Sequence, residues 1–150
     1  MTLKDAIQEI KTCAQQMNVR YGNVVFDEFA LVSLAGKKGR VLAYIGPRRT
    51  GFQKNFLTDA GPLMEGLLTQ NSTAGDFEFA RHGVGTCFEA FMTVGDGLFL
   101  ICNNTVQSMD TIAKDPRWIG AQVPFADLSD KFRYYPLTMG SKAQEAHPVV

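Results

Sequence analysis

The sequence predicts an α/β protein of the α+β type, with a five-stranded antiparallel sheet and helices on both of its faces. The main observation is the stretch from Gly75 to Asn104, which is typical of three consecutive antiparallel strands joined by two glycine turns. Residues 98–102 are apolar at every position, as in a central strand that is buried on both sides. An apolar helical stripe at the start of the chain and a hairpin over residues 24–45 complete the prediction.

The opening segment, residues 2–17, predicts an amphipathic helix. Thr2 is a suitable N-cap, and Asp5 follows at the position of the acidic partner in a capping box. One stripe forms because the apolar residues recur every three or four positions. They are Leu3, Ile7, Ile10, Ala14 and Met17. We expect this helix to lie on one face of the sheet.

The hairpin that follows has strands over 24–34 and 40–45, both rich in β-branched and aromatic residues. The glycines and lysines at 36–39 are typical of its turn. Asp27 and Glu28 interrupt the first strand and are expected to point to opposite faces, because side chains alternate along a strand. This favours a bulge or a frayed strand start over a catalytic pair of carboxylates.

A second helical region covers residues 48–71. Its apolar stripe is broad and aromatic, and Gly61-Pro62 interrupts it. This pattern predicts a short helix or ordered loop over about 50–59 and a helix from Pro62 to Thr69. Arg48 and Arg49 precede the region without a phosphate-binding motif, so solvated side chains are favoured over an anion site.

The second half of the chain predicts the strands 76–82, 87–94 and 98–102, followed by helices. Asn103-Asn104-Thr105 is expected to cap a helix over 106–114. A last short helix is predicted over 125–132, within an appended segment 116–137. The full predicted order is α-β-β-α-β-β-β-α plus this C-terminal helical extension.

Composition and length indicate one globular domain. The 150 residues are 45% hydrophobic and 20% charged, and fifteen basic residues balance fifteen acidic ones. Zero net charge argues against nucleic-acid binding through general electrostatics. We expect one domain over 1–137. A flexible tail is predicted over 138–150, where the chain becomes polar and small.

The cysteines and the start of the chain indicate a cytoplasmic protein without a membrane span. Cys13, Cys87 and Cys102 are widely spaced and form no CxxC pair, which favours buried, reduced thiols over zinc ligands. The opening MTLKDAIQEIK lacks the apolar core of a signal peptide. No stretch reaches the roughly 18 apolar residues that a transmembrane helix needs.

Catalytic, metal and cofactor patterns are weak throughout, so neither an enzyme nor a cofactor is predicted. Cys87, His82 and Asp96 have the residue types of a nucleophilic triad, but His82 and Asp96 lie at opposite ends of one predicted strand. The chain has two histidines, too few for a multi-histidine metal site. The glycines at 83–85 lie in a hairpin and do not open a helix after a strand.

The order of elements over residues 2–114 resembles the profilin-like topology, and in particular the roadblock/dynein light-chain family. The resemblance implies that strands 40–45 and 76–82 lie at the sheet edges and that 98–102 lies at the centre. It also implies a non-enzymatic, dimeric regulatory or scaffold protein that binds partner proteins, such as a small Ras-like GTPase. Gly61-Pro62 and the segment 116–137 depart from the family pattern.

The predicted interface combines the proline-free edge strand 76–82 with the broad apolar face of the second helical region. A homodimer is favoured over a monomer in which the segment 116–137 covers that face. The alternative function is a ligand-binding sensor of PAS- or GAF-like type, with a pocket around Phe88, Phe91 and Trp118. The interface candidates are Phe52, Phe56, Leu63, Met64, Leu67, Phe77, Phe79 and Arg81.

Overall fold

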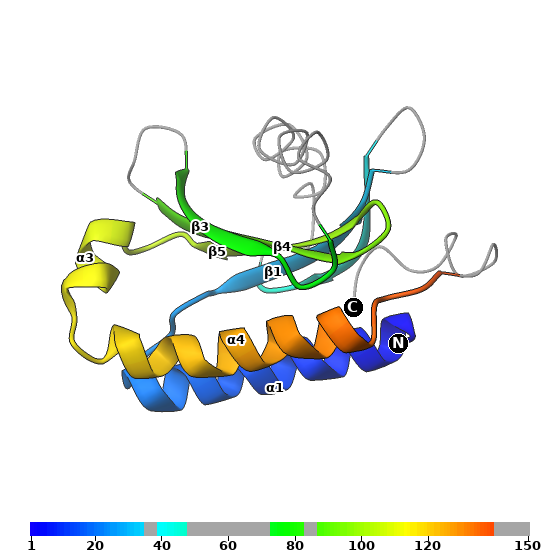
Figure 1. The fold of residues 1–150 in the computed structure, drawn as a ribbon. Helices are drawn as coiled ribbons and strands as arrows, with labels where there is room; N and C mark the ends of the chain where they lie inside the picture. The colour runs from blue at the N-terminus through cyan, green and yellow to red at the C-terminus, as the bar shows by residue number, and fades with distance from the viewer. Residues whose placement is uncertain (35–38, 48–72, 83–86, 140–150) are drawn as a thin grey trace.

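The computed structural model describes residues 1–34, 39–47, 73–82 and 87–139 (Figure 1). Their strands form one five-stranded antiparallel sheet in the order β2-β1-β5-β4-β3. This confirms the predicted fold class, with β5 at the centre and β2 and β3 at the edges. The elements are α1 (Leu3–Tyr21), β1 (Glu28–Ser33), β2 (Arg40–Ile45), β3 (Phe77–His82), β4 (Cys87–Gly95), β5 (Leu98–Asn104), α3 (Met109–Lys114) and α4 (Trp118–Tyr134).

Helix α1 begins as the sequence predicts and ends one turn later. The Thr2 side chain accepts from the backbone N–H of Asp5, and the Asp5 side chain accepts from the backbone N–H of Thr2, so the capping box is complete. The predicted end at Met17 is too early because the buried stripe continues to Tyr21. Gly22 ends the helix in the left-handed conformation at φ 82°, which glycine adopts without steric cost.

Strand β1 begins at Glu28, later than the predicted start at Val24. The residues before it are held by hydrogen bonds to the end of β5. Asn104 Nδ2 donates to the carbonyl of Val25 at 2.8 Å, and the N–H of Asp27 donates to the carbonyl of Asn103 at 2.9 Å. The pairing of β1 with β2 shifts register at Leu31 and Val32. A bulge or a frayed strand start was expected at Asp27 and Glu28; the late start of β1 fits the second alternative, and the bulge lies farther along the strand.

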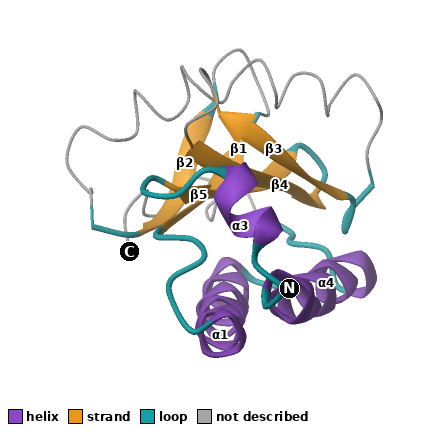
Figure 2. Cartoon of the chain, turned by 90° about the vertical axis from the view of Figure 1, so that its left-hand side faces the viewer, coloured by secondary structure: helices purple, strands orange, loops and turns teal. Residues whose placement is uncertain are grey.

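Helices α1 and α4 lie side by side and antiparallel on one face of the sheet (Figures 1 and 2). Figure 2 shows α1 on the side of β2 and α4 on the side of β3. An ion pair between Lys131 and Glu9 joins the two helices. Among the residues that the structure describes, no helix has the length and apolarity needed to cross a membrane.

The C-terminal helices differ from the prediction. Asn103 and Asn104 belong to β5, and Ser108 caps α3, which is a short helix of six residues. The last helix is much longer than the predicted 125–132 and includes Pro124. It forms because its buried residues recur at helical spacing and pack on the sheet. They are Trp118, Ala121, Pro124, Phe125, Leu128, Ser129 and Phe132.

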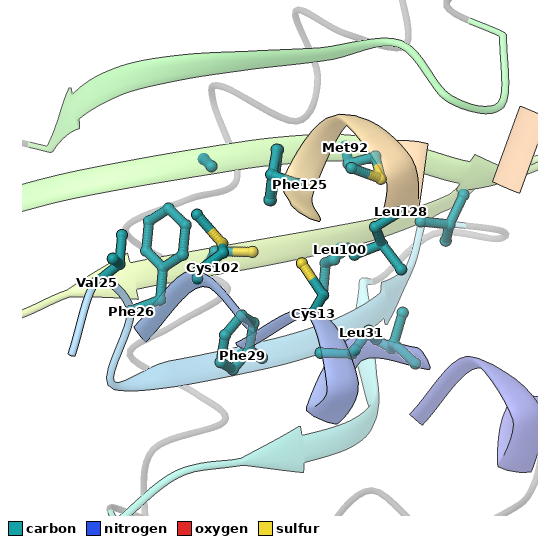
Figure 3. Close-up of a cluster of buried hydrophobic side chains, with 14 of the residues drawn as sticks. Cys13, Val25, Phe26, Phe29, Leu31, Met92, Leu100, Cys102, Phe125 and Leu128 are labelled. Atoms are coloured by element: carbon teal, nitrogen blue, oxygen red, sulfur yellow. The ribbon is translucent and has the colours of Figure 1, made fainter. Parts of the chain in front are cut away.

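The sheet separates two clusters of buried side chains. The larger one fills the space between the sheet and the two long helices, and it includes Phe29, Leu100 and Phe125 (Figure 3). The smaller one lies on the opposite face and includes Val32, Phe91 and Ile101. The helices predicted over 50–69 fall outside the described residues, as does most of the predicted tail. Within the tail's described part, the N–H of Thr138 donates to the carbonyl of Met1 at 3.1 Å.

Candidate functional site

Edge strand β3 presents one row of backbone groups away from the sheet. The N–H of Thr93 on β4 donates to the carbonyl of Asp76 at 2.9 Å, which fixes where the hydrogen-bonded pairs begin. Because such pairs alternate in an antiparallel ladder, the N–H and C=O groups of Phe77, Phe79 and Arg81 point away from β4. In the described sheet β3 has a neighbour on one side only. Its outer row is therefore a template for a further strand.

The two phenylalanines of β3 lie between the edge and the core. The Phe77 ring packs edge-to-face on Phe125 at 5.1 Å between centroids and keeps 38% of its surface exposed. Phe79 is half-buried and contacts both Phe125 and Trp118, at 5.3 and 5.2 Å. Glu78, between them, is exposed. Both phenylalanines of the predicted apolar edge therefore pack against α4.

Helix α4 also holds the start of β3. Ser129 Oγ donates to the carbonyl of Gly75, and Arg133 lies 3.5 Å from Asp76 Oδ1. Asp76 Oδ2 accepts from the backbone N–H of Thr73 at 2.9 Å and from its hydroxyl at 3.1 Å. The bond from the Thr73 backbone is the main reason why the pKa of Asp76 lies below its usual value. The edge is thus fixed before any partner arrives, which lowers the entropy cost of pairing.

The side chains of the other predicted interface residues lie outside the described part of the chain. Arg81 stands on β3 opposite Phe88 of β4, and its side chain lies outside the described part of the chain. The remaining five candidates fall in the range 48–72, which the structure does not describe. They are Phe52, Phe56, Leu63, Met64 and Leu67. The described part of the predicted interface is therefore β3.

A row of buried polar side chains crosses the sheet at the level where Glu89 of β4 pairs with Ala80 of β3. The sequence did not predict this row. Glu28 is 1% exposed and accepts from the Tyr44 hydroxyl at 2.9 Å and from Asn103 Nδ2 at 3.0 Å. Glu89, which is 2% exposed, stands opposite Asn103 on β4. The four residues stand on four adjacent strands, β2, β1, β5 and β4. Glu28 and Glu89, each set among apolar strand residues, were the signals for it in the sequence.

Asp27 and Glu28 do not form a joint site. Asp27 accepts from the N–H of Thr105 at 3.2 Å and also bonds to the Thr105 hydroxyl, whereas Glu28 bonds to Asn103. Each carboxylate therefore ties the start of β1 to the end of β5. Among the described residues, no group of three or more His, Cys, Asp or Glu side chains is arranged to hold a metal ion.

The aromatic residues suggested for a ligand pocket do not share one face. Trp118 packs edge-to-face on Phe88 at 5.4 Å, and both rings belong to the cluster under the helices. Phe91 lies on the other face of the sheet. Phe88 also contacts the rings of Phe26 and Phe79, at 5.2 and 5.6 Å. Ring-on-ring contacts therefore occupy the space next to Phe88.

Two of the three thiols are buried between α1 and β5. Figure 3 shows Cys13 and Cys102 among the apolar side chains of the helix-side cluster. Burial raises the pKa of Cys13 to about 12 and that of Cys102 well above its usual value. A thiol is a poor nucleophile and metal ligand in this form. The Cys87 side chain lies outside the described residues.

Comparisons of this chain with protein-family models, with curated proteins and with solved structures gave no match. The functional argument therefore rests on the fold, on the outward-facing backbone of β3 and on the contacts that hold that strand. Strands β2 and β3 are both edges of the described sheet, and we place the candidate site on β3 because α4 holds its start and Phe77 stays 38% exposed beside its outer hydrogen-bonding groups.

Proposed function

We propose that this protein is a non-enzymatic, dimeric regulatory or scaffold protein of roadblock type, in which two copies join through β3. In this proposal the dimer binds partner proteins, such as a small Ras-like GTPase. The observation that carries the dimer is the outer row of β3, where the N–H and C=O groups of Phe77, Phe79 and Arg81 point away from β4. The strand order, which the family resemblance implied, supports the assignment to this type.

Self-pairing suits this edge for two reasons. An antiparallel pair centred on Phe79 places the outward groups of Phe77 opposite those of Arg81 in the other copy, so each outward N–H meets a carbonyl. The 38% exposure of Phe77 leaves apolar surface that a second copy would cover. Charge does not oppose the association, because the net charge of the chain is zero.

A ligand-binding sensor has less support. Its three proposed pocket residues lie on two faces of the sheet, and Phe88 and Trp118 are packed against other rings. The carboxylates of Glu28, which is buried, and Asp27, which is partly exposed, are engaged by Asn103 and Thr105, which suits a structural role better than a reaction. We therefore assign the proposed binding function to the outer edge of β3 and not to a pocket in the interior.

Sedimentation velocity tests the dimer, with Arg81→Pro and Arg81→Ser as a matched pair. Both variants remove the arginine side chain, but only proline removes the outward N–H, while the bonds from β3 to β4 are kept. We expect a dimer for wild type and Arg81→Ser and a monomer for Arg81→Pro. A wild-type protein that stays monomeric at micromolar concentration would contradict the proposal.

The partner class needs a separate measurement. Small Ras-like GTPases loaded with a fluorescent GDP or GTP analogue are titrated with the dimer, and anisotropy and nucleotide release are followed. Binding by the wild type that weakens in Arg81→Pro would support a dimeric GTPase regulator. No binding in either nucleotide state, across a panel of such GTPases, would remove this partner class and leave the dimer to be judged by sedimentation.

A further inference from the structure

The outer row of β3 can face a second copy in more than one register. Its outward N–H and C=O groups belong to Phe77, Phe79 and Arg81, which alternate with residues bonded to β4. In an antiparallel self-pair these groups meet whenever the two-fold axis passes through a residue of the strand. The axis can therefore lie at any residue from 77 to 81, and the side chains decide among these positions.

The two end positions of the axis give a short pairing and bring like charges together. Because β3 spans Phe77–His82, an axis at Phe77 or at Arg81 pairs one end of the strand and leaves the other end unpaired. An axis at Phe77 sets Asp76 opposite Glu78 of the second copy. An axis at Arg81 sets the two arginines opposite each other. Like charges directly across a strand pair destabilise it, so neither end position suits a stable dimer.

The positions on either side of Phe79 are each disfavoured by a described side chain. An axis at Glu78 sets the two Glu78 residues directly opposite each other, and this side chain is exposed. An axis at Ala80 sets Phe77 opposite position 83, past the end of β3. Phe77 is 38% exposed and would then keep its apolar surface in water. Charge opposes the first position, and lost burial opposes the second.

An axis at Phe79 avoids both costs in the backbone pairing. It sets Phe77 opposite Arg81 of the second copy in both halves of the dimer. Every outward residue of β3 then faces another outward residue of β3. This register also places a partner strand next to the exposed surface of Phe77.

The charged residues fit the same register. Glu78 lies opposite Ala80 of the second copy, which is uncharged. Asp76 lies opposite His82, which is not acidic. Across residues 76–82 no like charges therefore face each other. A strand with the charge pattern of β3 is complementary to itself, which identifies a second copy as a partner that fits this edge.

We propose that Glu78 is the residue that determines the specificity of the β3 edge. This inference rests on the proposed β3 dimer and deepens it, because it names what selects the register. Glu78 acts by repulsion, which disfavours an axis through itself and any partner strand with an acidic residue opposite it. The second copy meets this requirement with Ala80. Because Phe77 and Phe79 on either side of it pack against α4, Glu78 stands on a supported part of the strand.

Disulfide cross-linking reads the register directly. Protein with Phe77→Cys is mixed with protein that has Arg81→Cys, both in a Cys87→Ser background, and the mixture is oxidised with glutathione disulfide. Residues directly opposite each other in such a pair have Cα atoms about 5.5 Å apart, which a disulfide spans. The mixture is prepared with Glu78 intact, with Glu78→Asp, which keeps the charge, and with Glu78→Gln, which removes it. Glu78→Cys is oxidised alone as a second measurement, since this site is exposed.

With Glu78 intact or with Glu78→Asp, we expect the mixed dimer of Phe77→Cys and Arg81→Cys to be the main cross-linked product. With Glu78→Gln the yield of this product should fall by at least about twofold, and Glu78→Cys should cross-link to its own counterpart. Equal yields in all three backgrounds, with no Glu78→Cys dimer, would overturn the role of Glu78 and leave the β3 dimer in place. A parent protein that is monomeric by sedimentation would instead overturn the proposed function and this inference with it.

Discussion

Strands β5 and β3 come from the same stretch of sequence and have opposite roles. β5 has a strand on each side and buried apolar residues, such as Leu100 and Ile101, on both faces. β3 has a strand on one side, and Phe77 is 38% exposed. Both strands contain aromatic residues, so hydrophobicity alone does not separate them. The difference is the number of strand neighbours, which makes β5 the centre of the fold and β3 a surface for association.

The largest effect should follow a truncation in β5. Leu100 is fully buried in the helix-side cluster, so Leu100→Ala leaves a cavity and should lower the free energy of unfolding by about 2–5 kcal/mol. Urea denaturation followed by circular dichroism measures it. A loss below about 1 kcal/mol would mean that β5 is not the packed centre of the sheet.

The next effect concerns the buried polar row. Tyr44→Phe removes the hydroxyl that donates to Glu28 at 2.9 Å, and leaving a buried hydrogen-bonding group without its partner costs about 1–3 kcal/mol. Tyr134→Phe is the matched control, because Tyr134 is 76% exposed. We expect a loss of unfolding free energy within that range for Tyr44→Phe and none for Tyr134→Phe. Equal effects would contradict a supporting role for the row.

These two sites also mark the limit of what the sequence predicts. The buried, central character of β5 was predictable because an unbroken apolar run is a local signal, whereas the order of the strands came from the family resemblance. The bond between Glu28 and Asn103 was not predictable, since the two residues lie 75 positions apart in the chain. Helix α4 was predicted too short because Pro124 and Gly120 are poor helix formers, and packing of Trp118, Phe125 and Phe132 overrides them.

A smaller effect is expected at the edge strand. Phe77→Ala removes a ring that is partly solvated already, so the folded monomer should lose about 1 kcal/mol, much less than the buried β5 site loses. The measurement belongs in an Arg81→Pro background, in which self-pairing does not contribute to stability. A loss as large as that of Leu100→Ala would remove the contrast between centre and edge.

The smallest effect is expected outside the sheet, at the junction of α3 and α4. Hydrogen bonds from the Arg117 side chain lower the pKa of Asp115 from its usual 3.8 to about 2. A lowered folded-state pKa stabilises the fold above the unfolded pKa, so this contribution is lost as the pH falls from about 4 to about 2. Asp115→Asn should flatten that part of the acid-unfolding curve. An NMR titration midpoint of Asp115 near 4 would contradict the assignment.

The central claim is that β3 is an association edge and not merely the last strand of the sheet. Sedimentation velocity of the wild type, Arg81→Ser and Arg81→Pro over a series of concentrations tests it most directly. The predicted result is a dimer for the first two proteins and a folded monomer for the third. A monomeric wild type, or an Arg81→Pro variant that still dimerises with wild-type affinity, would contradict the account.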